Sequence, residues 1–510
     1  KRRKGFDVVV EPMYRRGVSS DEIKDYIQDA YDNWERPPEY VLLIGDVNAA
    51  GIQMPTFYIN NPDRQEVDPT DQPYVQLEGD DYFIDAFIGR ISCDSPNPGD
   101  LQRALARYLR HEKELQNLNG LDRGAFHRAT IFGGNFGDSG NPISSPVETC
   151  RWLGERLRDR GYDVEEFYYE HEGDNNDPGP IVRSIDRGVN IVAYRGWADA
   201  NGPHYPQFHK DNLDELTNEP LLPIFTFFVC NTGDFDNNDH TQCFGEYSIT
   251  RGTRRTPRGA LAFFGPSDLH TKTMFNNPML GGFYFSLLYR NIRTFGPLTL
   301  AGKMEIWNGY PNKRERGRQV EFYTSVYNIL GDPEVTVYLD APFTLEVEHA
   351  DRMFVGDSYG EFHVRNQAGS PVEGAMVTLR KTDETVITLL TDSDGLALVP
   401  VQLESEGELE VTVIARQAYP YMATIPVSSP ERNIGFAAVE ISNGEDDRLI
   451  TGAPVDLTVT LHNSGAFAAG SVQAELSTPL DCIEIVSSHA EFGDIPPGES
   501  AAADAPYRVI

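Results

Sequence analysis

The chain has 510 residues, which is too many for one hydrophobic core and predicts three or four domains. Its formal net charge of −34, from 78 acidic against 44 basic residues, argues against nucleic-acid binding and against docking on anionic lipid. The apolar content of 40% is typical of well-packed globular proteins, and no apolar run approaches the length of a membrane span.

Strand-like and helix-like segments alternate through the first two thirds of the chain. Strands are expected at 6–10, 40–44, 80–90, 129–135, 163–169, 189–194, 224–230 and 259–265, with helices at 19–34, 100–117, 146–160, 180–187 and 279–290. This order predicts an α/β fold with two adjacent doubly wound, mostly parallel sheets. We expect two α/β subdomains, at residues 1–125 and 126–340.

The pattern changes after residue 340, where strand-like runs alternate with turns and helical periodicity is absent. Residues 341–430 and 431–510 each have the length and alternation of a β-sandwich domain, and the second stops in mid-pattern. The chain also begins inside a βα unit, with neither Met nor a signal peptide, so we expect a fragment or processed product.

The cysteines are five in number and widely spaced. No CxxC pair occurs, which argues against zinc. One disulfide is possible, but at least one thiol must remain free or pair with another chain. Cys230 ends the apolar run IFTFFVC and is followed by a turn rich in Gly and Asp. It can be a buried structural thiol or a nucleophile presented at the tip of a strand.

A thiol nucleophile needs an imidazole to accept its proton. His204 follows the strand at 189–194 and is the best candidate; His209 and His240 are the other nearby histidines. Acidic loops at 80–81, 173–177 and 234–239 can be calcium ligands or solvated turns, and none has the spacing of an EF-hand.

Several motifs in sequence order resemble the gingipain-type cysteine peptidases, peptidase family C25. They are YVLLIGD at 40–46, DDYFIDAFIGRIS at 80–92, VNIVAYRG at 189–196, FFVCNTGDF at 227–235, GALAFFGPSDLHT at 259–271 and YNILGDPEVTVY at 327–338. The resemblance implies a caspase-like α/β fold followed by immunoglobulin-like domains. It also implies a secreted or cell-surface protein that hydrolyses polypeptides with a Cys–His dyad.

Residue by residue, Cys230 matches the nucleophile of the family, and the N–H of Ala198 matches an oxyanion donor. Asp81, and with it Asp46, match ligands of a structural Ca²⁺. The chain departs from the family at Trp197, which stands where the family has its histidine, and indole has no basic nitrogen. His204 could replace the missing base if the turn at Asn201–Gly202 folds the loop back.

A second departure concerns specificity, because the stretch near residues 145–146 is neutral where arginine-specific members carry an acid. The resemblance therefore predicts a secreted cysteine endopeptidase, and the sequence does not support a preference for basic residues at P1. The alternative is a catalytically inactive surface, adhesive or assembly protein that self-associates through its immunoglobulin-like domains.

Overall fold

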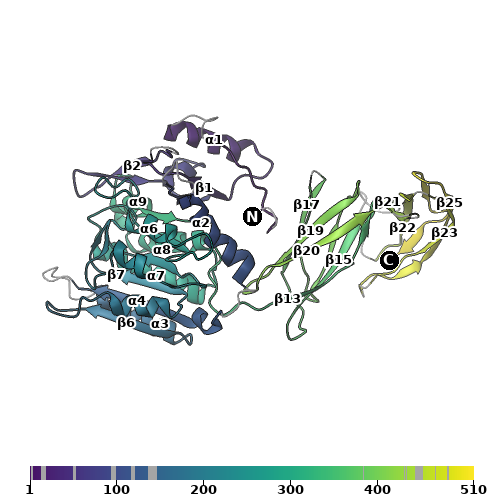
Figure 1. Cartoon of the computed structure of the whole chain (residues 1–510). Coiled ribbons are helices and arrows are strands. Elements are labelled where there is room, and N and C mark those ends of the chain that lie inside the picture. The colour runs from purple at the N-terminus through teal and green to yellow at the C-terminus, as the bar shows by residue number, and fades with distance from the viewer. Residues whose placement is uncertain are drawn as a thin grey trace. The chain divides into compact units, whose positions relative to one another are not determined.

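The computed structural model describes residues 1, 4–12, 19–49, 53–93, 99–115, 121–135, 146–382, 384–429, 431, 433–442, 452–465, 467–478, 480 and 482–510. The chain divides into two compact units (Figure 1). One is an α/β unit, Val10–Ala341, and the other combines Lys1–Val9 with the strand-rich residues Pro342–Ile510.

The α/β unit is built on one eight-stranded sheet. Its spatial order is β1 (Tyr40–Ile44), β4 (Phe87–Ile91), β12 (Tyr327–Leu330), β11 (Ala262–Pro266), β10 (Ile224–Phe227), β7 (Ile191–Arg195), β5 (Arg128–Gly134) and β6 (Asp163–Tyr169). All neighbours are parallel except β11 and β12. The two expected sheets are thus joined edge to edge, through the pair Leu330↔Arg90.

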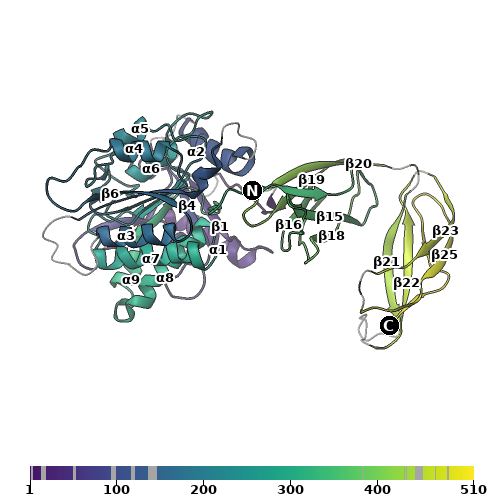
Figure 2. The ribbon, with the colours of Figure 1, turned by 90° about the horizontal axis from the view of Figure 1, so that it is seen from below.

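Helices cover both faces of this sheet (Figure 2). One face carries α3 (Pro146–Arg158), α7 (Thr273–Tyr289), α8 (Phe295–Gly309) and α9 (Gln319–Val326), and the other carries α2 (Gly99–Leu109), α4 (Gly179–Asp186), α5 (Lys210–Glu215) and α6 (Phe244–Thr250). Successive residues of β7 alternate between the two cores: Ile191 and Ala193 face the first, Val192 and Tyr194 the second. The doubly wound α/β fold predicted from the apolar strands is confirmed.

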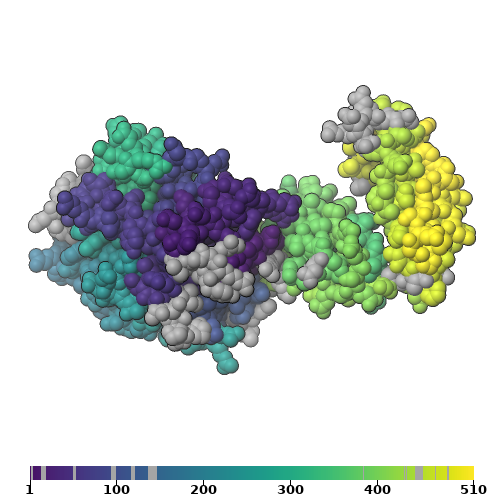
Figure 3. Space-filling view, turned by 90° about the horizontal axis from the view of Figure 1, so that it is seen from above, coloured from purple at the N-terminus to yellow at the C-terminus, as the bar shows by residue number. Residues whose placement is uncertain are grey.

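Helix α1 (Ser20–Asn33) begins at a capping box. The Ser19 hydroxyl accepts the N–H of Glu22, and the Glu22 carboxylate accepts the N–H of Ser19. The purple N-terminal segment that includes α1 lies at the surface of the α/β unit (Figure 3). The sequence SSDE therefore fixes where this helix starts.

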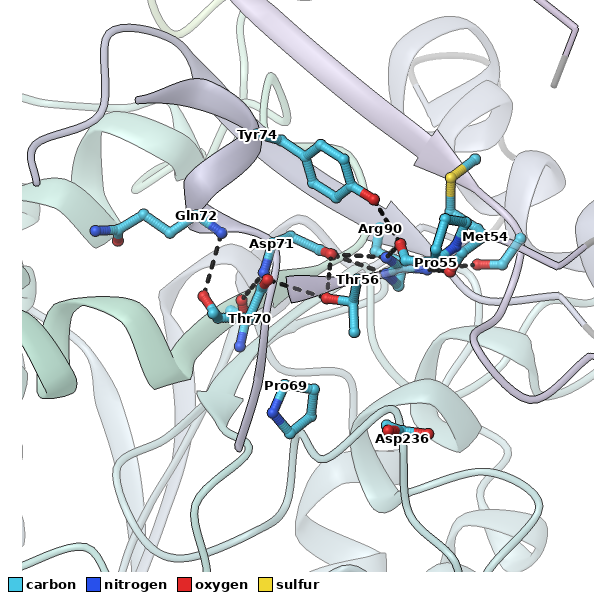
Figure 4. Close-up of polar contacts among 12 residues, drawn as sticks. Met54, Pro55, Thr56, Pro69, Thr70, Asp71, Gln72, Tyr74, Arg90 and Asp236 are labelled. Atoms are coloured by element: carbon cyan, nitrogen blue, oxygen red, sulfur yellow. Dashed lines mark hydrogen bonds and ion pairs between the residues drawn. The ribbon is translucent and has the colours of Figure 1, made fainter. Parts of the chain in front are cut away.

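A buried ion pair ties strand β4 to the hairpin of β2 (Phe57–Asn60) and β3 (Val67–Thr70) (Figure 4). Arg90 is fully buried, and its Nε and Nη2 donate to the two carboxylate oxygens of Asp71 at 2.7 and 2.6 Å. Its remaining N–H groups donate to the carbonyls of Gly45, Met54 and Pro55. Such a bidentate pair holds three chain segments in one arrangement.

The second unit is made of strands packed as sheets. A three-stranded sheet of β13 (Leu345–Glu348), β15 (Tyr359–Asn366) and β18 (Leu396–Pro400) shares one apolar core with a five-stranded sheet of β14 (Met353–Phe354), β20 (Tyr421–Ser428), β19 (Gly407–Ile414), β16 (Met376–Lys381) and β17 (Thr385–Leu390). Further along lie β21 (Ile434–Ser442), β22 (Val455–Asn463), β23 (Ala469–Glu475), β24 (Ile485–Ser487), β25 (His489–Ile495), β26 (Ser500–Ala502) and β27 (Tyr507–Val509), around a smaller core. Residues 6–10, expected as a strand, form none; Lys1–Val9 pack with this unit, where Gly5 lies against Thr378 and Thr388.

All five cysteines lie in the described part of the chain, and all are free thiols. The one disulfide that the composition allowed is therefore absent among them. Of the described helices, none combines the length and the apolar character that crossing a bilayer requires.

Candidate active site

Cys230 lies at the carboxyl edge of the central strand β10. Because β7 and β11 flank β10 and run parallel to it, the segments that follow these three strands meet at one edge of the sheet. Trp197 follows β7, and the loop Ser267–Thr271 follows β11. The parallel pairing Phe227↔Tyr194 places the tips of β7 and β10 side by side.

The Cys230 thiol contacts the side chain of Thr271. Its Sγ lies 3.3 Å from Thr271 Oγ1, which itself donates to the Val229 carbonyl at 2.6 Å and accepts from Asn276 Nδ2 at 2.9 Å. Since the hydroxyl proton is used on Val229, the thiol is the donor in its contact with Thr271. The structure thus holds Cys230 as a neutral, positioned thiol.

The pKa of Cys230 is raised to about 11. Dense packing around the sulfur is the main cause; the Thr271 hydrogen bond and the buried Arg195 act in the opposite direction, and Asp268 adds to the rise. Arg195 itself donates from Nε to Asn277 at 2.8 Å, while its Nη2 has no hydrogen-bond partner among the described residues. A guanidinium beside the sulfur can stabilise negative charge that develops during a reaction.

This pKa predicts how Cys230 reacts with a small alkylating agent in the free protein. Because only the thiolate reacts, we expect the rate of iodoacetamide modification to rise about tenfold per pH unit between pH 8 and 10 without levelling off. Peptide mapping of the modified Cys230 measures the rate, with free cysteine as the reference. A plateau below about pH 9 would show that the resting thiol is already ionised by a partner.

The turn after Cys230 is fixed to the loop that follows β11. Asn231 adopts a left-handed conformation with φ of 51°, which is uncommon for a residue other than glycine. Its N–H donates to the carbonyl of Asp268 at 2.8 Å. The backbone around the sulfur is therefore held by the same loop that carries Thr271.

The loop after β7 folds back as a short hairpin of β8 (Ala198–Asp199) and β9 (Gly202–Pro203). The turn at Asn201–Gly202 permits this, with φ of 121° at Gly202. The pairing places His204 opposite Trp197, with 5.2 Å between their ring centroids and a bond from the His204 N–H to the Trp197 carbonyl. His204 thus lies beside Trp197, the residue that we expect at the family's histidine position.

Both ring nitrogens of His204 have partners. Nε2 lies 3.1 Å from an Asp199 carboxylate oxygen, and Nδ1 lies 3.1 Å from Nε2 of His209. Burial alone would raise the pKa of Asp199, but hydrogen bonds from His204 and from the Asn201 N–H lower it. Among the described residues, no hydrogen bond joins His204 to Cys230.

Trp197 is 44% exposed and stacks on Tyr205, with 5.7 Å between the ring centroids. Ala198, expected to supply an oxyanion donor, is fully buried in the core beneath α4, α5 and α6. His240 is partly buried beyond the Cys230 turn. Cys243 is fully buried at the start of α6, as a packing residue would be.

The two expected calcium ligands lie apart. Asp46 follows the carboxyl end of β1 and is 3% exposed, whereas Asp81 precedes the amino end of β4 and is exposed. Because β1 and β4 are parallel, Asp46 and Asp81 adjoin opposite ends of this pair of strands. An Asp81 carboxylate oxygen accepts the N–H of Phe83 at 2.8 Å, which leaves the other oxygen available to a hard cation.

Sequence reasoning missed the loop after β11. Thr271, Asp268 and His270 all lie in the motif GALAFFGPSDLHT, which we quoted only for its resemblance. The buried strand that precedes these residues could have indicated them. It pairs in parallel with β10, so the residues that follow it lie beside Cys230. Of the stretch that bears on specificity, Ser145 lies outside the described residues, and Pro146 begins α3.

Comparison with known proteins shows which family this chain matches. The model of peptidase family C25 matches residues 1–338. Gingipain R2 of Porphyromonas gingivalis is 23% identical over 457 residues, covering 88% of this chain and 56% of the relative, and gingipain R1 of the same species is 23% identical over 425 residues, covering 81% and 40%. The chain therefore spans about half the length of the curated relatives it matches.

Solved structures agree on the fold. The crystal structure of the Arg-specific cysteine proteinase gingipain R superposes with a TM-score of 0.68 and 21% identity, covering 80% of this chain and 88% of that one. A complex of the pro- and mature domains of RgpB from P. gingivalis gives 0.70 and 21%, covering 83% and 94%. The chain has the caspase-like α/β core of the gingipains and belongs to peptidase family C25.

Proposed function

We propose that this protein is a secreted cysteine endopeptidase, in which Cys230 attacks the peptide carbonyl and His204 accepts the thiol proton. The observation that carries the proposal is the hairpin that brings the His204 ring to 5.2 Å from the Trp197 ring, because by resemblance Trp197 stands where the family has its base. Asp199 at Nε2 orients the ring, which is the role a third group has in a catalytic unit.

In this mechanism the resting thiol is neutral and ionises only when substrate docks. Nδ1 of His204 is the nitrogen that takes the proton, and it exchanges its contact with His209 for one with the sulfur. The thiolate forms a bond to the peptide carbonyl carbon, and the imidazolium then returns its proton to the leaving amine. The N–H groups of Cys230 and Ala198 are the proposed oxyanion donors, with Arg195 adding positive charge.

The remaining features of the proposal follow from family membership. The substrate is a polypeptide, and the protein works outside the cell or at its surface. A structural Ca²⁺ binds at Asp81, and Asp46 belongs to a separate site at the opposite end of the β1 and β4 pair. The β-sandwich strands after residue 341 form immunoglobulin-like domains that space or self-associate the enzyme.

Hydrolysis of a denatured protein substrate tests this function. The full chain is expected to cleave it, and Cys230→Ala is expected to abolish cleavage because the nucleophile is gone. Cys243→Ala, which removes a buried thiol at the start of the next helix, serves as the matched control and is expected to retain it. Cleavage that survives Cys230→Ala would contradict the proposal.

The second candidate function is that of a catalytically inactive protein that binds partners, and the state of the Cys230 thiol supports it. Cys230 is hydrogen-bonded to Thr271 rather than to an imidazole, and its pKa is about 11, which fits a protein that has lost catalysis and binds partners. Trp197→His separates the two candidates, since it restores the family's residue. If the natural chain is inactive for lack of a base, this variant is expected to cleave where the natural chain does not.

A further inference from the structure

A cluster of metal-ligand side chains lies beside, but separate from, the Cys230 thiol. Glu66 from the β2–β3 turn and Asp268 and His270 from the loop after β11 bring one ligand atom each within 4.8 Å of one another. His270 Nδ1 lies 2.9 and 3.1 Å from the two oxygens of Glu66. The Asn61 amide donates to both Glu66 and Asp268, at 3.0 and 3.2 Å, and aligns the two carboxylates. We call Glu66, Asp268 and His270 the Glu66 cluster.

The carboxylate of Asp268 has unused capacity. Asp268 is fully buried, and its Oδ2 has no hydrogen-bond partner in the described part of the chain. Asp68, 7% exposed, likewise has a buried Oδ2 without a partner. Leaving a buried carboxylate oxygen unpaired is costly unless the group is neutralised by a proton or by a cation. An independent observation thus points to a ligand at this cluster.

The charges around the cluster are strongly unbalanced. The carboxyl groups of Asp268, Glu66 and Asp234 all lie near enough to Asp68 to repel a negative charge on it. The basic groups that face this loop are His270, which is bound to Glu66, and Lys272, which is bound to Asp63 at 2.5 Å. Among the described residues, four carboxyl groups (Glu66, Asp68, Asp234 and Asp268) therefore share the His270 imidazole as a nearby basic group.

We propose that Glu66, Asp268 and His270 bind one divalent transition-metal ion of the zinc type. An imidazole and two carboxylates are ligands that suit Zn²⁺, whereas Ca²⁺ and Mg²⁺ prefer sites made of oxygen alone. Two ligands bonded at about 2.0–2.2 Å to one tetrahedral ion lie about 3.3–3.6 Å apart. His270 Nδ1 and the Glu66 oxygens, at 2.9 and 3.1 Å, would therefore separate by a few tenths of an ångström when the ion replaces their hydrogen bond. The lack of a CxxC pair argued against zinc, whereas the site proposed here uses no cysteine.

The site is coupled to the thiol through the backbone. Asp268 accepts the Asn231 N–H through its carbonyl, and Thr271, next to His270, contacts Cys230 Sγ. An ion at the cluster would cross-link the β2–β3 hairpin to the loop that holds the sulfur. The proposal does not depend on whether Cys230 is catalytic.

Calorimetric titration of the full chain with Zn²⁺ tests the proposal, using Cys230→Ser as the parent so that the thiol cannot bind the metal. One equivalent of Zn²⁺ is expected to bind. Asp268→Asn and His270→Gln are each expected to weaken binding by at least about tenfold, since even changes outside the ligand shell cost that much. The matched control is the double variant His204→Gln, His209→Gln, which removes the two histidines that contact each other in the loop after β7. This control is expected to bind Zn²⁺ as tightly as the parent protein.

The affinities in the two sets of variants decide the outcome. Unchanged binding in His270→Gln and Asp268→Asn would overturn the proposal, as would binding that disappears only in the His204 and His209 control. His270 is partly exposed, so its replacement leaves the core intact and decides the question even if Asp268→Asn fails to fold. Binding of Co²⁺ to the Cys230→Ser protein is expected to give visible absorption bands that His270→Gln removes.

Discussion

Replacing Asp71 by asparagine is expected to lower the free energy of unfolding of the α/β unit by about 3–5 kcal/mol. The Arg90 and Asp71 side chains are 0% and 4% exposed, so neither charge can be solvated when its partner is removed. Without the carboxylate charge, the Arg90 guanidinium keeps the three backbone carbonyls to which its other N–H groups donate, the ring of Phe235 and the amide oxygen of the new side chain. None of these groups carries a full negative charge. The decrease in the free energy of unfolding is measured by denaturant titration, from the unfolding transition of the α/β unit.

Asp163→Asn is the matched control in the same unit. Asp163 pairs with Arg187 at 2.9 Å, but the two side chains are 60% and 45% exposed, and exposed pairs contribute about 0–1 kcal/mol. We expect the free energy of unfolding of this variant to lie within about 1 kcal/mol of that of the natural protein. Equal losses in the two variants would show that Arg90–Asp71 is not the anchor of β4.

Replacing His204 by alanine is expected to lower kcat/KM for peptide hydrolysis by about 10²–10⁴-fold, the usual contribution of a general base. The reason is local: His204 carries the imidazole that the hairpin sets beside Trp197 and that Asp199 orients. Steady-state kinetics with a fluorogenic peptide, together with thermal unfolding to verify the fold, measure the effect.

His209→Ala is the matched control for His204→Ala. His209 contacts the same ring at Nδ1, yet in the proposed mechanism that contact is given up when the thiol approaches. We therefore expect a loss well below that of His204→Ala. If the two variants lose activity equally, or if His209→Ala loses more, the assignment of the base to His204 is wrong.

The sequence was sufficient for most of the α/β fold because its strands are short apolar runs buried on both faces. It could not show that the two expected sheets are continuous. That join depends on Leu330 meeting Arg90, two residues 240 positions apart, and on β12 running antiparallel to β11. No local periodicity records such a pairing. The segment at 6–10 has an apolar pattern but forms no strand, and its residues 6–9 pack with the strand-rich unit instead of the sheet.

The candidate site was only partly predictable for the same reason. Cys230 is identified by its position after an apolar strand, and the Asn201–Gly202 turn indicated that His204 could fold back. The side chains that surround the sulfur come from the loop after β11, about 40 residues further on. Their contacts with the thiol and with Glu66 depend on strand order, which a local sequence pattern does not specify.

The central claim, a Cys230–His204 dyad, is tested most directly by labelling with a thiol-reactive peptide electrophile. A peptide that docks as a substrate reports whether the base reaches the sulfur in the complex, which alkylation of the free protein does not. The account predicts that Cys230 is labelled in the natural chain and that His204→Ala loses most of this labelling. Labelling of Cys230 that His204→Ala leaves unchanged would contradict it.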